Sequence, residues 1–180
     1  MKNLHTEDGF TLIELMIVVA ILAVLSAVAI VAYTKWIRSA REAEAQSILS
    51  DIRIKQEAYR ASFREYAESG LTGPAWSPNN SKPDSAAINW TSTANANVSS
   101  AWAQLGLTPS GKHFYFRYII EAGAPGDVPV VFVDRNIPNA SDFWFGARAV
   151  GDLDEDGECE GFEIYSASDL IHRVDTVACP

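Results

Sequence analysis

Residues 12–32 read LIELMIVVAILAVLSAVAIVA, an apolar run of 21 residues whose one strongly polar member is Glu14. As an α-helix rising about 1.5 Å per residue, the run is about 31 Å long, close to the roughly 30 Å of a bilayer hydrocarbon core. A helix in a soluble core normally keeps a polar face, and a secretory signal peptide has a shorter apolar core. The run therefore predicts a membrane-spanning helix.

Glu14 lies near the start of this span. A carboxylate costs on the order of 2–4 kcal/mol near mid-bilayer and less toward the interface. Two interpretations follow: the side chain snorkels to the lipid headgroups, or it awaits a partner cation, because an intramembrane ionisable group commonly marks a functional site.

The segment GFTLIE, residues 9–14, followed directly by the apolar run, resembles the type III signal sequence of type IV prepilins and pseudopilins. The resemblance implies a leader of residues 1–9. It implies cleavage between Gly9 and Phe10 by a prepilin peptidase at the cytoplasmic face, and methylation of the new amino group of Phe10. It also implies that Glu14 pairs with the α-amino group of Phe10 in a neighbouring subunit, where an unpaired buried charge would be costly.

The charges around the span depart from the family pattern. The leader has Lys2 as its firm cation, against Glu7 and Asp8. Three cations flank the other end of the span: Lys35, Arg38 and Arg41. The positive-inside rule alone would orient this chain backwards. We give the signal motif precedence over that count.

Residues 33–69 continue the helix in amphipathic form, since no Gly or Pro interrupts residues 10–69 and Val31 stands where many family members have a helix-breaking Pro. Gly70 is the expected stop. An apolar stripe recurs at three- and four-residue steps: Ala45, Ile48, Leu49, Ile52, Tyr59, Phe63 and Tyr66. The stripe predicts that this face of the helix packs against a β-sheet.

Residues 70–111 are rich in Pro, Gly, Ser, Asn and Ala and predict an irregular connection, with one short helix near residues 99–105. β-Branched and aromatic runs then predict strands at residues 113–121, 128–134, 143–150 and 162–166. The predicted fold class is α+β: a long N-terminal helix packed on a small antiparallel sheet, with residues 112–180 forming the sheet and a C-terminal loop. This is the pilin fold that the resemblance implies.

The net charge is concentrated in residues 121–180, which hold 3 Lys/Arg and 13 Asp/Glu. Such a surface repels phosphate backbones, so no nucleic-acid partner is expected. Asp152, Asp154, Asp156 and Gly157, with Glu163 to close the loop, fit the calcium pattern D-x-D-x-D-G-x5-E. These four carboxylates are the predicted Ca²⁺ ligands, and the alternative is a solvated acidic turn.

The two cysteines, Cys159 and Cys179, both lie in this acidic third, and no Cys/His cluster suggests zinc. In an oxidising compartment they would form one disulfide, and in the cytosol they would be idle thiols. The resemblance implies the disulfide, since many pilins close a C-terminal loop this way.

The function implied by the resemblance is a structural subunit of a type IV pilus, which polymerises with itself through its apolar helix into an adhesive or motile surface filament. The alternatives are a pseudopilin of a type II secretion system and a minor or priming pilin. The implied partners are the prepilin peptidase/methylase and an inner-membrane assembly machinery. Before assembly the chain is expected in the inner membrane. No hydrolase, metalloprotease or P-loop motif is present, so no enzymatic activity is expected.

Overall fold

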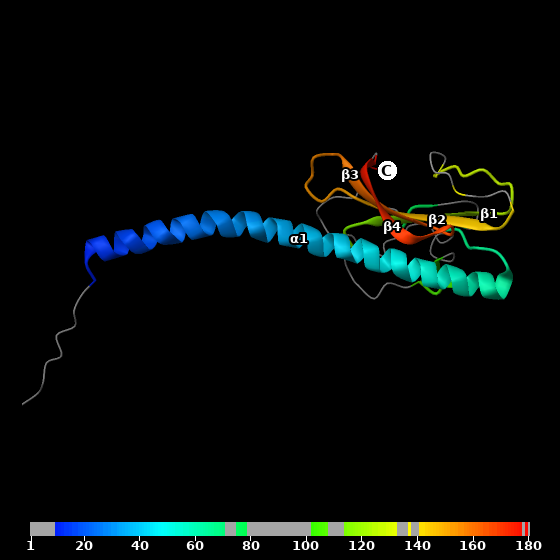
Figure 1. The fold of residues 1–180 in the computed structure, drawn as a ribbon, viewed down its shortest axis with the longest axis horizontal. Helices are drawn as coiled ribbons and strands as arrows, with labels where there is room; N and C mark the ends of the chain where they lie inside the picture. The colour runs from blue at the N-terminus through cyan, green and yellow to red at the C-terminus, as the bar shows by residue number, and fades with distance from the viewer. Residues whose placement is uncertain are drawn as a thin grey trace, which may run out of the picture. The chain divides into compact units, whose positions relative to one another are not determined.

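A computed structural model describes residues 10–70, 75–78, 102–107, 114–132, 137, 141–177 and 179. The elements assigned within these residues are the helix α1 (Leu12–Phe63) and the strands β1 (Arg117–Gly123), β2 (Trp144–Gly151), β3 (Cys159–Tyr165) and β4 (Ser168–Val177), which Figure 1 labels. The chain divides into two compact units, residues 1–40 and 41–180. The second unit is called the head below. The leader, residues 1–9, lies outside the described residues.

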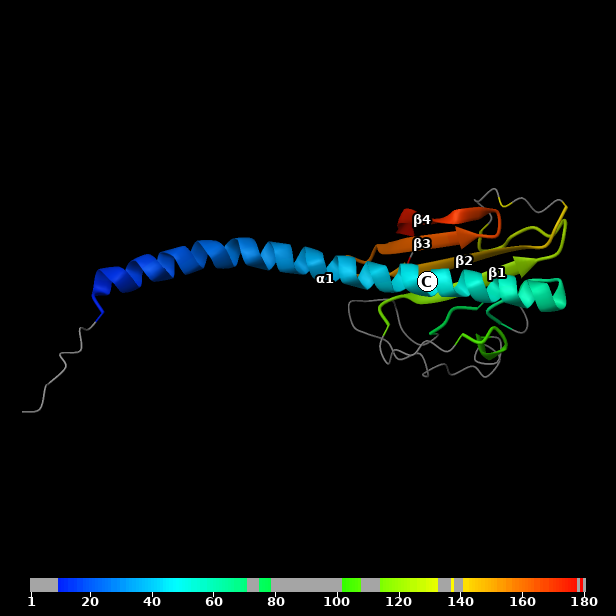
Figure 2. The same ribbon diagram turned by 60° about the horizontal axis from the view of Figure 1, so that its bottom comes forward.

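The head is built on one antiparallel sheet in the order β1-β2-β3-β4. The part of α1 that belongs to the head lies along one face of this sheet (Figure 2). Alternate side chains of the strands point to that face and meet the helix. Their shared core comprises Ala45, Leu49 and Ile52 of α1 and Tyr118, Ile120, Phe145, Ala147, Ala149, Phe162 and Ile164 of the sheet. The predicted α+β class, with a long helix on an antiparallel sheet, is confirmed.

The helix ends at Phe63, six residues before the predicted end near Ser69. Arg64 adopts a left-handed φ of 63°. The buried amide of Gln56 binds the returning chain: its Nε2 donates to Ala67 O at 2.5 Å, and Ala67 N donates to its Oε1 at 2.9 Å. The helix stops because the side chain of Gln56, rather than Gly70, binds the backbone where the chain turns back at Ala67.

The predicted strand at residues 128–134 is wrong for residues 128–132, which carry no strand, and residues 133–134 lie outside the described part of the chain. The carboxylate of Glu121 takes the backbone donors that a strand would need. It accepts the N–H groups of Val130, Val131 at 2.9 Å and Phe132 at 3.2 Å. This fixes Phe132 over Gly146, where an added Cβ would approach the ring within 2.9 Å.

Two further differences concern the sequence-predicted organisation. β4 was not predicted, because its mixed polar sequence lacks clear alternation. Within the predicted irregular connection, Trp102 and Leu107 are buried in the core of the head. Most of that connection lies outside the described residues.

Candidate functional site

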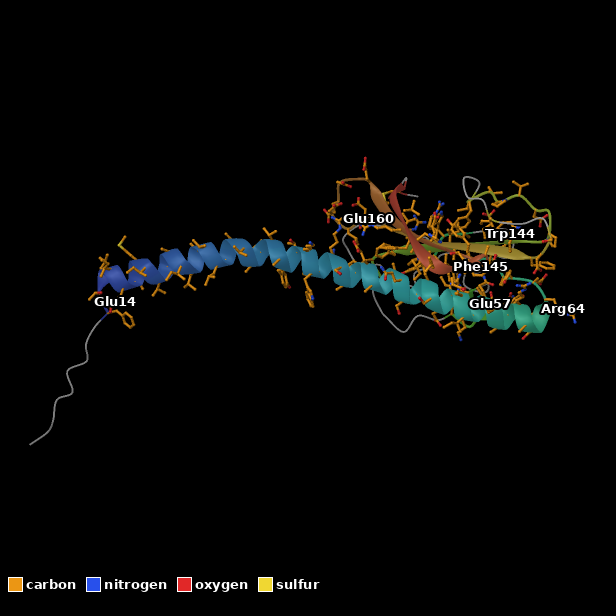
Figure 3. All side chains as sticks on the ribbon, viewed as in Figure 1. Glu14, Glu57, Arg64, Trp144, Phe145 and Glu160 are labelled. Carbon is orange, nitrogen blue, oxygen red and sulfur yellow. A yellow bond between two sulfur atoms is a disulfide. The ribbon has the colours of Figure 1, made fainter. Side chains whose placement is uncertain are left out.

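The first turn of α1 places Thr11 and Glu14 in a capping box. Thr11 N donates to Glu14 Oε2 at 2.9 Å, and the Thr11 hydroxyl donates to the same oxygen at 2.7 Å. Glu14 N lies 3.3 Å from Thr11 Oγ1, to which it donates. Two N–H groups that the helix cannot pair internally are thereby satisfied. Figure 3 shows Glu14 at the start of the helix.

Glu14 therefore has partners within its own chain, which the sequence analysis did not anticipate. The signal was available, because Thr-x-x-Glu before an apolar run is a capping-box pattern. Phe10, the expected first residue after cleavage, is 86% exposed and precedes the box directly. Gly9 lies outside the described residues. Sequence reasoning missed Thr11 as the hydrogen-bond partner of Glu14.

The apolar run that follows is exposed in the part of the chain that the structure describes. Every residue from 12 to 32 is exposed, and the least exposed large apolar side chain among them, Val18, is still 48% exposed. The 18-residue window that defines this candidate membrane span has a mean hydropathy of 3.1, and none of its residues is buried. By length and composition, this part of α1 is sufficient to cross a membrane.

The acidic loop between β2 and β3 brings three of the four predicted calcium ligands together. Carboxylate oxygens of Asp152, Asp154 and Asp156 lie within 4.8 Å of one another. Asp152 is buried and anchors the turn, accepting from Glu155 N at 2.7 Å and Gly157 N at 3.1 Å. A left-handed φ of 88° at Gly157 allows the sharp bend that the pattern requires.

Glu163, the fourth predicted ligand, lies elsewhere. It stands in β3 opposite Arg148 of β2, and its fully buried carboxylate accepts from Arg148 Nε at 2.6 Å. The hydroxyl of Tyr165 donates to its other oxygen. The strand carries Glu163 onto the sheet, so the placement does not bring it into the aspartate group.

A disulfide joins Cys159 at the start of β3 to Cys179, with Cα atoms 5.2 Å apart. Cys159 is buried and directly follows the acidic loop. The bond therefore ties the end of the chain to the base of the loop. The disulfide restrains the loop even without a bound ion.

Comparison with known families adds one finding. Residues 4–30 match the prokaryotic N-terminal methylation motif. No curated protein and no solved structure matches the chain significantly. The matched motif points to a structural subunit processed by a prepilin peptidase rather than to an enzyme. The N-terminal segment is thus a type IV prepilin-like signal, and together with the pilin-like arrangement of helix and sheet it supports the pilin-like family for this chain.

Proposed function

We propose that the chain is a structural subunit of a type IV pilus, stored as a single-pass membrane protein and polymerised through the apolar half of α1. The observation that carries this proposal is the apolar run of residues 12–32, in which every residue is exposed. Apolar surface in water costs about 25 cal/mol per Å², so the run needs lipid or other apolar helices around it. Lipid surrounds the run while the subunit is stored in the membrane, and the apolar helices of other copies surround it after assembly.

Glu14 gives the assembled state its register in this proposal. Inside a bundle of apolar helices, its carboxylate needs a cation, and the processed amino group of Phe10 in a neighbouring copy supplies one. The Thr11 hydrogen bonds hold the carboxylate at the helix terminus, where the first residue of a neighbouring copy would reach it. Both capping hydrogen bonds go to Oε2, so the neighbour's amino group can pair with Oε1 while the cap stays in place.

A pseudopilin of a type II secretion system is the second candidate. The Trp-containing connection would favour a surface-displayed filament if its tryptophans were exposed. Trp102 is instead buried at 1% exposure and serves the core of the head. Burial of Trp102 means that this tryptophan does not support surface display, so the pseudopilin stays a candidate.

The first test is processing. Mass spectrometry of the membrane-extracted protein is expected to show a chain that begins at methylated Phe10. Replacing Gly9 by a bulky residue is expected to leave the precursor uncut. An intact N-terminus on the wild-type protein would exclude both candidates. Recovery of the processed chain in filaments sheared from the cell surface separates a pilus subunit from a periplasmic pseudopilin.

We also propose that Asp152, Asp154 and Asp156 bind a structural Ca²⁺. Hard cations prefer carboxylate oxygens, and three such groups on alternate residues converge here. Backbone carbonyls and water would complete the six to eight oxygens that Ca²⁺ takes. The alternative is a solvated acidic turn held by its own hydrogen bonds.

A further inference from the structure

Four side chains surround α1 directly beyond the apolar run, and we call them the collar: Tyr33, Lys35, Trp36 and Arg38. Tyr33 and Trp36 are 61% and 68% exposed. Lys35 is exposed and Arg38 is half-exposed. Assembly through the apolar run does not explain these residues, and the two cations oppose the positive-inside rule in the orientation that the signal requires.

The collar sits at the depth of a membrane surface. Tyr33 follows Leu12 by 21 positions, which places it about 32 Å along the helix, at the edge of a hydrocarbon core of roughly 30 Å. Trp and Tyr favour this boundary because one end of the ring system is apolar and the other is polar. A lysine stem can lie along apolar surface there while its ammonium group reaches the headgroups.

The collar covers both sides of the helix. At about 100° per residue, the aromatic pair and the cationic pair point in directions about 160° apart. A protein partner docks on one side of a helix, whereas a headgroup layer surrounds it. The arrangement therefore favours lipid over a docked protein.

The charge of this segment is of one sign. No acidic residue occurs between Glu14 and Glu42. Glu42 accepts from Arg173 of the head at 3.3 Å, and the Arg41 guanidinium lies 4.2 Å from the centre of the Tyr115 ring. The head thus engages the charges that follow the collar, and within the collar the side chain of Lys35 is exposed.

We propose that the collar binds anionic phospholipid headgroups in the leaflet opposite the one that holds Phe10, and so fixes the depth of the stored subunit. The proposal rests on the proposed function in one respect, that α1 spans the membrane before assembly. Each Lys or Arg near an anionic membrane surface increases binding to that surface about fivefold. Binding of Lys35 to these headgroups offsets the unfavourable orientation of the charge at this end of the span.

Energy transfer to labelled lipids tests the proposal on the full-length protein. Both native cysteines are joined in the disulfide, so Ser39→Cys introduces a unique thiol for a fluorescent donor. The labelled protein is placed in phosphatidylcholine vesicles with trace acceptor-labelled phosphatidylglycerol or phosphatidylcholine. Transfer to phosphatidylglycerol is expected to exceed transfer to phosphatidylcholine. Lys35→Gln is expected to reduce the preference about fivefold, and added salt to weaken it.

Lys55→Gln, which removes a lysine of the same helix within the head, is the matched control and is expected to keep the preference. Trp36→Leu is expected to change the depth of the label, measured with lipids brominated at graded depths, whereas Phe63→Leu leaves it unchanged. If the inserted protein transfers energy equally to both lipids, the collar does not bind anionic headgroups, and the proposed function still stands. Protein that alkali extracts from the vesicles overturns both. Lys35-dependent transfer between two labelled copies, without lipid preference, indicates an acidic protein partner and overturns the lipid assignment.

Discussion

At the scale of single residues, Gln56 decides where α1 ends. It lies on the buried stripe of the helix, one turn after Ile52, and is fully buried. Its amide pairs with both backbone groups of Ala67, so a polar residue in an apolar position is satisfied. The pairing also lets Tyr66 pack against Phe145, with ring centres 4.8 Å apart.

Gln56→Leu is therefore expected to destabilise the head. Leucine fits the apolar surroundings but leaves the N–H and carbonyl of Ala67 buried without partners, at a cost of about 2–4 kcal/mol in the free energy of unfolding. Chemical denaturation of the full-length protein in detergent measures this. Gln46→Leu, at an exposed position of the same helix, is the control and should stay within about 0.5 kcal/mol of wild type. Wild-type stability of Gln56→Leu would show that the amide pairing is dispensable.

At the scale of elements, the contact between α1 and β1 contains a partly buried carboxylate. Glu44 Oε1 accepts from Tyr115 N at 3.2 Å and from the Tyr118 hydroxyl at 3.4 Å. Burial raises the pKa of Glu44 above its ordinary value, and these hydrogen bonds and nearby Arg41 only partly oppose the shift. The folded state therefore binds this proton more readily than the unfolded state does.

The sign of the pH effect follows from linkage. Between the ordinary pKa of Glu44 and its raised pKa in the head, the folded state holds more protons, so this group lowers stability as the pH rises. Glu44→Gln is neutral and keeps the acceptor oxygen. Its stability relative to wild type is expected to be higher at pH 7 than at pH 4, measured by denaturation in detergent. Glu44→Ala separates charge from hydrogen bonding, because it should be destabilised at both pH values. A pH-independent difference between Glu44→Gln and wild type would contradict the assignment.

The acidic loop between β2 and β3 carries the calcium prediction. An ion that binds only the folded state stabilises it by about 2.7 kcal/mol when the free ion concentration is 100-fold above the Kd. The Tm of the full-length protein in detergent is expected to rise with calcium and fall with chelator, and magnesium should substitute poorly. Asp154→Asn should remove most of the response.

Glu155→Gln removes the same charge from the neighbouring position and is expected to spare the calcium response. Glu163→Gln should lower stability, because Arg148 loses its charged partner, while the response to calcium remains. The titration is run with the Cys159–Cys179 bond intact and reduced, since the bond restrains the loop by itself. A Tm that calcium leaves unmoved in both forms would identify a solvated acidic turn.

At the scale of the whole molecule, the chain joins two units with opposite solvent requirements. Residues 1–40 include an apolar run that is exposed in the described part of the chain, whereas residues 41–180 enclose a core of their own. In the proposed function, lipid and then other copies of the chain cover the apolar run of the first unit. Glu14 is the charged group on which this assembly is expected to depend.

Glu14→Ala is expected to leave insertion and cleavage intact and to abolish filaments, since losing one partner of a buried pair costs about 3–5 kcal/mol. Glu14→Gln keeps an oxygen for the capping box but removes the charge. Both variants should fail to appear in the sheared-filament fraction if pairing with an amino group is required. Filaments from Glu14→Gln would mean that the cap suffices, and filaments from Glu14→Ala would refute any role of Glu14 in assembly.

The sequence alone determined the features that depend on local composition. Residues close together in the sequence determine five features: the signal at residues 9–14, the apolar run, the continuation of the helix without Gly or Pro, the α+β class and the aspartate loop. Each follows from periodicity, hydropathy or spacing, which act over a few turns or one strand. Such signals do not need the rest of the fold.

The tertiary structure decided what depends on distant partners. Gln56 stops the helix by binding Ala67, and Glu121 prevents a strand by taking the N–H groups of Val130, Val131 and Phe132. Strand register sets Glu163 opposite Arg148 and so separates it from the aspartates. In each case a buried polar group must find a partner within the folded chain, and the cost of leaving it unpaired outweighs the local preference of the segment it binds.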